Sequence, residues 1–228
     1  MALVSYRLEE SVATITLDDG KVNVLSIPML TEINAALDQA ESAGAVVVLT
    51  GRDGRFSGGF DLSVLRAGGP DALTMLRGGF DLAERLLTFP TPVVVACSGH
   101  AIAMAAFLLL SGDFRIGAAG PFKITANEVA IGLPMPIAAI EICRQRLTPT
   151  AFNRAVILAE VFSPDDAVAA GFLDRVVPAA DLGDHAQRTA VELSALDMRA
   201  HAATKLSVRS HALDALRVAI ERDHPLPR

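Results

Sequence analysis

A single glutamate in apolar surroundings is the strongest candidate for acid/base chemistry in this sequence. Glu128 follows Asn127 and precedes the apolar run of residues 129–134, which contains a glycine and a proline. A carboxylate with few polar companions is partly desolvated, which raises its pKa and suits it to proton transfer. A glutamate that faces solvent at the edge of an apolar run would give the same pattern.

The loop of residues 56–62 is a candidate oxyanion site. It follows the continuous apolar run of residues 45–51, which predicts a strand covered on both faces. The adjacent Gly58 and Gly59 let the backbone approach a ligand closely. A helix that begins near Asp61 would direct free backbone N–H groups into the loop, where they can bind an oxyanion. An ordinary tight turn also uses a Gly-Gly pair.

Residues 98–107 form a second turn that leads into an apolar helix. They follow the apolar run of residues 93–97, and alanines at positions 101, 103, 105 and 106 allow close approach. The N–H group of Met104 would be a second donor at a helix start. A buried, alanine-rich packing helix would have the same composition.

The elements around these residues alternate between apolar strands and amphipathic helices, which predicts an α/β fold. Residues 4–17 predict a hairpin that turns at residues 9–11, and Ser26 predicts a helix start with Pro28 in the first turn. Further strands are expected at residues 93–97, 114–118 and 172–177, and helices at 71–88 and 103–111. From about Pro136 onward the pattern is mainly helical. Residues 93–110 are interpreted as strand, turn and helix rather than a membrane span.

Composition excludes several classes of protein. The chain has 228 residues, 51% of them hydrophobic, and a net charge of −6 without a basic block, so nucleic acid and anionic membranes are not expected partners. Cys97 and Cys143 lie in apolar segments and are expected to be free thiols. Neither a signal-peptide pattern nor metal-ligand spacing is present, which indicates a cytoplasmic protein.

Taken in order, these segments resemble the crotonase family of enoyl-CoA hydratases and isomerases. The similarity covers the N-terminal hairpin and residues 21–25, 45–51, 56–62, 98–113, 127–134 and 163–178. The resemblance implies an α/β fold built as a spiral of β-β-α repeats over residues 1–162. It also implies a mostly helical region at 163–228, and assembly into homotrimers or hexamers.

The resemblance also implies roles for individual residues. The N–H groups of Phe60 and Met104 would hold the thioester carbonyl of an acyl-CoA, and Glu128 would transfer the proton. Met104 replaces a glycine of the family's pattern. No cofactor is implied, because coenzyme A is part of the substrate. The implied substrate-binding residues are Lys21, Val22, Gly58, Gly59, Asp61, Leu62, Phe107 and Leu133.

Phe107 is the main departure from the family's hydratases, which resemble this chain but have a second glutamate there. One glutamate suffices to move a double bond, so the resemblance favours a Δ3,Δ2-enoyl-CoA isomerase with Glu128 as sole acid/base. A slow 2-enoyl-CoA hydratase and a non-catalytic acyl-CoA-binding protein are the alternatives. The nearby acids that could complete a two-carboxylate mechanism are Asp61, Asp113 and Glu141.

Residues outside these motifs also have candidate roles. Lys21 and Arg52 could contact CoA phosphates, and Lys205 could act across a subunit boundary. His100 is interpreted as a core or turn histidine. The late helices are expected to contribute to a trimer interface through Ala200, Ala203, Leu206, Ala212, Leu213 and Leu216.

Overall fold

A computed structural model describes residues 2–223, so residues 224–228 of the predicted C-terminal region lie outside the described part of the chain. The strands are β1 (Val4–Glu9), β2 (Val12–Leu17), β3 (Val46–Gly51), β4 (Gly54–Ser57), β5 (Val93–Cys97), β6 (Gly99–Ile102), β7 (Phe114–Ala118), β8 (Ile124–Thr125) and β9 (Arg175–Val177). The helices are α1 (Ile27–Ser42), α2 (Leu62–Ala67), α3 (Gly69–Thr88), α4 (Met104–Leu110), α5 (Ile137–Arg144), α6 (Pro149–Leu158), α7 (Pro164–Ala170), α8 (Leu182–Ser194) and α9 (Met198–Asp223), with short 3₁₀ turns η1 (Val129–Ile131) and η2 (Ala179–Asp181).

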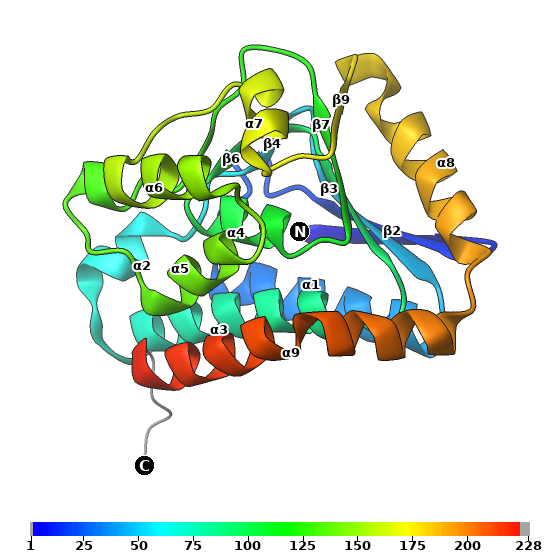
Figure 1. Ribbon diagram of the computed structural model, residues 1–228, viewed down its shortest axis with the longest axis horizontal. Coiled ribbons are helices and arrows are strands. Elements are labelled where there is room, and N and C mark those ends of the chain that lie inside the picture. The colour runs from blue at the N-terminus through cyan, green and yellow to red at the C-terminus, as the bar shows by residue number, and fades with distance from the viewer. Residues whose placement is uncertain (1, 224–228) are drawn as a thin grey trace.

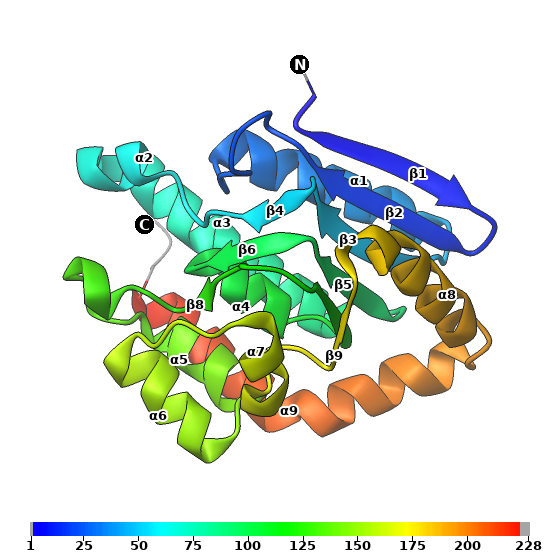
Figure 2. The same cartoon turned by 90° about the horizontal axis from the view of Figure 1, so that it is seen from above.

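The strands form two sheets that the chain visits in turn. The larger sheet has the order β1-β2-β3-β5-β7-β9, and the smaller has the order β4-β6-β8. Strands β3 and β4 lead to α3, β5 and β6 lead to α4, and β7 and β8 lead to α5 (Figure 2). In each set the first strand belongs to the larger sheet and the second to the smaller. The fold is therefore a β-β-α spiral followed by a helical region.

The larger sheet is covered on both faces, which explains its continuous apolar strands. Val47 and Val95 belong to the main core with α1, α3 and α4. Their neighbours Val48 and Val94 point the other way and pack with α8, as the alternation of side chains along a strand requires. In Figure 1, α8 lies on one side of the sheet while α1, α3 and α9 run together on the other.

Most of the predicted elements are present. The hairpin of β1 and β2 turns at residues 10 and 11, and the side chain of Ser26 accepts a hydrogen bond from the amide of Met29 at the start of α1. The run at residues 93–110 is β5, β6 and α4, and no helix of the described residues has the length and apolarity to cross a membrane. The helix expected to begin near Asp61 is α2, whereas the short strands β4, β6 and β8 were not predicted.

Two expectations for the C-terminal half are wrong. The strand predicted at 172–177 begins only at Arg175, because the amides of Phe172 and Leu173 bond to the carbonyl of Ala167 and close the end of α7. Leu213 and Leu216 were expected at a subunit interface, but they are buried against the core of their own chain. Leu206 is exposed, as an interface residue would be in a single chain.

A buried charge cluster fastens α9 to the beginning of β7. Asp113 accepts hydrogen bonds from Val93 N and Lys205 Nζ, and it forms an ion pair with Arg209, with distances of 2.7 Å to Lys205 and 2.8 Å to Arg209. The Lys205 side chain is only 3% exposed. Burial outweighs the attraction of Asp113 and lowers the pKa of Lys205 to about 8. The ion pair between Lys205 and Asp113 therefore depends on the negative charge of Asp113, which offsets the cost of burying the ammonium group.

Replacing Asp113 by asparagine should destabilise the protein by about 3 kcal/mol, because the buried Lys205 and the partly buried Arg209 would lose their counter-charge. Asp214→Asn is the matched control, since Asp214 lies on α9 and its exposed pair with Arg217 should contribute less than about 1 kcal/mol. Urea denaturation of both variants measures the difference. Equal midpoints would show that the cluster does not hold α9.

Candidate active site

Asn23 holds the glycine loop in place from behind. Its side chain is fully buried, and Nδ2 donates hydrogen bonds to the carbonyls of Leu17, Arg55 and Phe56. Its own carbonyl accepts a hydrogen bond from the hydroxyl of Ser57 at 2.6 Å. Sequence reasoning used residues 21–25 only as part of a resemblance. The one signal of this role is an asparagine between two valines.

Gly59 allows the two predicted oxyanion loops to touch. A Cβ at this position would lie 2.7 Å from the carbonyl oxygen of Ile102, 3.2 Å from Ala103 Cβ and 3.5 Å from Met104 N. The residue also has a φ of 85°, where glycine is favoured. Any larger residue would push the loops apart.

Ala103 sets the direction of the Met104 amide. Its φ of 53° and ψ of −122° match the first central position of a type II′ turn, which normally requires glycine. The amide of Ala103 is anchored on the carbonyl of Thr125 at 2.8 Å. Such backbone strain in a non-glycine residue is typical of functional sites.

The N–H groups of Phe60 and Met104 are free in the described part of the chain. Neither donates a hydrogen bond to another described residue, although the neighbouring Gly59 carbonyl accepts one from Leu25 N. Met104 is the first residue of α4, where an amide has no partner within the helix. Two free donors on touching loops are therefore available to an oxyanion.

The side chain of Phe60 rests on Gly79 in α3. A Cβ at Gly79 would lie 2.4 Å from the Phe60 ring, so the missing side chain makes room for that ring. Phe60 also meets Phe80 edge-on, with ring centroids 6.4 Å apart. The position of the first loop thus depends on α3.

An apolar cavity of about 430 Å³ opens beside the two loops. Among the predicted site residues it is lined by Gly58, Phe60, Leu62, Phe107, Glu128 and Leu133. Lys21, Val22, Gly59, Asp61 and Met104 do not line it. Val22 packs on Gly58 and accepts its amide hydrogen bond, and the Met104 side chain is buried in the core.

Glu128 is buried in the wall of this cavity. Glu128 is 8% exposed, and its Oε2 atom has no hydrogen-bond partner among the described residues. Burial raises the pKa of Glu128 to about 7. Asn127 Oδ1, on the neighbouring lining residue, is likewise buried without a partner within residues 2–223. The solvent-facing alternative for Glu128 is therefore wrong, and the carboxyl group can take up and release a proton near neutral pH.

Phe107 closes the deep end of the cavity. Its ring is 1% exposed and stacks on Phe80 with centroids 6.3 Å apart. Of the described residues that line the cavity, Glu128 is the only ionisable one. The described lining of the cavity therefore combines one carboxyl group with the phenyl ring of Phe107.

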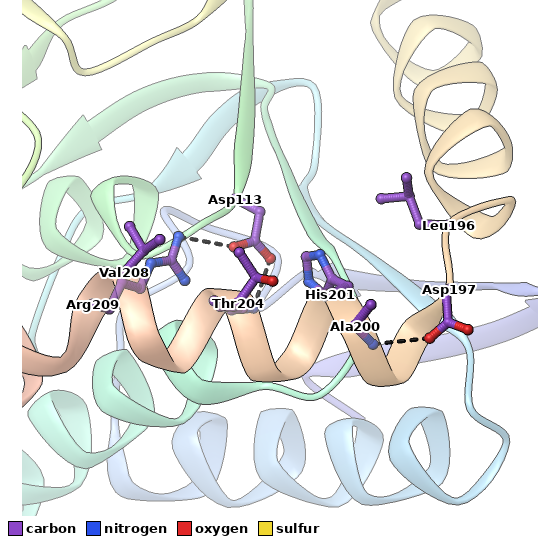
Figure 3. Close-up of a pocket in the computed structure, with 9 residues that line it drawn as sticks. Asp113, Leu196, Asp197, Ala200, His201, Thr204, Val208 and Arg209 are labelled. Carbon is purple, nitrogen blue, oxygen red and sulfur yellow. Dashed lines mark hydrogen bonds and ion pairs between the residues drawn. The ribbon is translucent and has the colours of Figure 1, made fainter.

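The other candidate acids lie elsewhere. Asp61 caps α2 by accepting a hydrogen bond from Ser63 N, and Glu141 pairs with Arg144. Asp113 belongs to the α9 charge cluster. That cluster borders a separate open pocket of about 420 Å³, which is also lined by His201 and Asp197 (Figure 3). None of the three acids lines the cavity of Glu128.

The remaining candidates have ordinary local partners. His100 accepts a hydrogen bond from Lys123 N through Nδ1 and packs against Phe122, as a turn histidine would. Arg52 lies 3.7 Å from Asp18, and Lys21 is exposed beside Val22. Lys205 is committed to Asp113, which removes it from the candidates for contact with another subunit.

Comparison with known proteins agrees with this geometry. Residues 7–226 match the enoyl-CoA hydratase/isomerase family model. A Rhodobacter capsulatus protein described as a probable enoyl-CoA hydratase is 32% identical over 89% of this chain and 79% of its own. Human mitochondrial enoyl-CoA delta isomerase 1 is 28% identical over 93% of this chain and 71% of its own.

Solved structures are similar over nearly the whole chain. A Pseudomonas syringae protein of the enoyl-CoA hydratase/isomerase family is 51% identical, with a TM-score of 0.96 and 97% and 96% of the two chains covered. A Mycobacterium tuberculosis protein described as an enoyl-CoA isomerase is 48% identical, with a TM-score of 0.93 and 96% of each chain covered. A second structure describes that protein as a probable enoyl-CoA hydratase.

The chain belongs to the enoyl-CoA hydratase/isomerase, or crotonase, family, whose members act on acyl-CoA thioesters. Its relatives include proteins named as hydratases and proteins named as isomerases. Family membership therefore defines the class of enzyme, and the particular reaction depends on the groups in the cavity.

Replacing Gly79 by alanine should destabilise the protein by about 1–3 kcal/mol, because the new methyl group overlaps the Phe60 ring. The adjacent Gly78→Ala is the matched control. A Cβ there would meet only Leu30 Cδ1 at 3.5 Å, so this variant should be stable or more stable than the wild type. Thermal denaturation compares the two. Equal losses would contradict the packing of Phe60 on α3.

Glu128→Gln should stabilise the protein at pH 8 by about 3 kcal/mol and have little effect at pH 4. The pKa of Glu128 rises from 4.5 to about 7 on folding, so the wild type loses stability as pH rises through this window. Glutamine has no charge to bury. Urea denaturation at both pH values measures the change, and a gain that does not depend on pH would contradict the raised pKa.

Proposed function

We propose that this protein is a Δ3,Δ2-enoyl-CoA isomerase. The observation that supports it best is the pairing of one buried carboxylate, Glu128, with the buried ring of Phe107 in the same cavity. Isomerisation needs one group that moves a proton between two carbons. Hydration needs a held and activated water molecule, for which this cavity offers one carboxylate and otherwise mainly apolar walls.

The reaction begins with proton removal. The thioester carbonyl of a 3-enoyl-CoA accepts hydrogen bonds from the N–H groups of Phe60 and Met104. The carboxylate of Glu128 takes a proton from C2, and the electron pair of the broken C–H bond delocalises over the conjugated system from the carbonyl oxygen to C4, with negative charge on the oxygen, C2 and C4. The two N–H groups stabilise the resulting dienolate, and the loss of one such donor commonly costs roughly a hundred- to a thousandfold in rate.

The reaction ends with return of the same proton. Glu128 donates it to C4, the C3–C4 double bond becomes C2–C3, and the carbonyl is restored. No water, metal or further cofactor enters the balance, because coenzyme A is already part of the substrate. A pKa of about 7 suits both halves of this transfer, since neither the acid nor the base form is too stable.

Binding of the CoA portion and assembly complete the proposal. The exposed Lys21 precedes Val22, which packs on Gly58 in the cavity wall, and from there Lys21 can meet a phosphate group. A homotrimer or hexamer fits the exposed apolar side chains of Leu206 on α9 and of Ile157 and Leu158 on α6. Light scattering at micromolar concentration tests the oligomer, and a monomer would contradict it.

Purified protein should convert 3-enoyl-CoA to 2-enoyl-CoA faster than it hydrates 2-enoyl-CoA. The isomerase kcat/KM should rise with pH up to about 7 and level off above, because Glu128 must be ionised to take the proton. Glu128→Gln should lower the rate by about a hundredfold or more. The rates can be followed by chromatography of the thioesters.

Glu141→Gln is the control, since Glu141 pairs with Arg144 outside the cavity. Hydration without isomerisation by the wild type would indicate the alternative, a 2-enoyl-CoA hydratase. Tight acyl-CoA binding with neither reaction would indicate a non-catalytic protein. Isomerisation that survives Glu128→Gln would mean that another group moves the proton.

A further inference from the structure

The two ends of the cavity differ in a way that limits the acyl chain. At the deep end, Phe80 and Phe107 are each 1% exposed and their rings stack, so no methylene group can pass beyond them. Phe60 packs against Phe80 and closes the same end. An acyl chain that extends past the reacting carbons must therefore leave in another direction.

The open end has an aliphatic rim. Leu62 is 48% exposed, Ile131 is 50% exposed and Leu133 is 46% exposed, and all three line the cavity. They come from two segments, α2 and the stretch between β8 and α5, which lie at the same end of the molecule (Figure 2). Half-exposed aliphatic side chains that adjoin an apolar cavity are typical of a binding surface.

Polar groups in the cavity are confined to one place. Asn127 and Glu128 are neighbours in the sequence, and the other described lining residues have apolar side chains or none. A hydroxyl or carboxyl group on the chain would find no partner at the rim and would lose its hydration. The lining therefore favours a plain hydrocarbon.

We infer that the preferred substrates are straight-chain 3-enoyl-CoA thioesters long enough for the tail to leave the cavity over Leu62, Ile131 and Leu133. This inference rests on the proposed function. Each methylene group laid on the rim leaves water and covers half-exposed aliphatic surface. Full burial of a methylene is equivalent to about a fourfold gain in affinity, so partial burial on the rim should give about two- to fourfold.

The test is the dependence of kcat/KM on chain length in the wild type and two variants. Ile131→Asn places a polar group on the rim. Val129→Asn is the matched control, because Val129 is a β-branched residue of the same turn η1, is 44% exposed and does not line the cavity. Wild type and Val129→Asn should gain about two- to fourfold per methylene until the rim is covered. Ile131→Asn should match them on short chains and lose the gain on long ones.

A flat chain-length dependence in the wild type would overturn the inference. An equal loss at every length in Ile131→Asn would also overturn it, because the rim would then contact the CoA portion. Calorimetry with saturated acyl-CoA thioesters of the same lengths measures the rim without turnover. If affinity rises with chain length but the protein has no isomerase activity, the proposed function is disproved and the role of the rim is supported. If the protein is an active isomerase but its affinity does not depend on chain length, the proposed function is supported and the role of the rim is disproved.

Discussion

No side chain larger than hydrogen fits between the backbone of Gly59 and the carbonyl oxygen of Ile102. This contact brings the loop after β4 against the loop after β6, so two free amides from different turns of the spiral come close together. Asn23 supports the first loop from behind, and Thr125 holds the second through the amide of Ala103. The neighbouring turns of one spiral thus act as a rigid frame for donors that neither could position alone.

Glu128 works against the stability of this frame. A buried carboxyl oxygen without a partner is costly when charged, and none of the described residues that line the cavity carries a positive charge. The same burial moves its pKa into the range where one group can both remove and return a proton. The burial that costs stability at Glu128 is therefore also what lets this carboxyl group exchange a proton near neutral pH, as is common at functional sites.

The strands of the larger sheet and most helices could be predicted, because they follow from apolar runs and helix caps in the sequence. The lone carboxylate could be predicted because residue 107 is a phenylalanine. The sequence did not predict β4, β6 or β8, which are two to four residues long and show no regular alternation. Asn23 was also missed as a clamp, since its three acceptors lie up to 33 residues away. The packing of Phe60 on Gly79 is likewise a tertiary contact without a local pattern.

The position of α9 has a consequence for synthesis on the ribosome. This helix packs on α3 and α5 (Figure 1). Its buried apolar side chains are Leu213, Leu216, Ala219 and Ile220. The residues that line the acyl cavity all precede Ile137, so they leave the exit tunnel well before α9 does. During that interval the nascent chain contains every described residue that lines the cavity, but the apolar surfaces of α3 and α5 are uncovered. The chain is therefore expected to depend on chaperones that bind such surfaces.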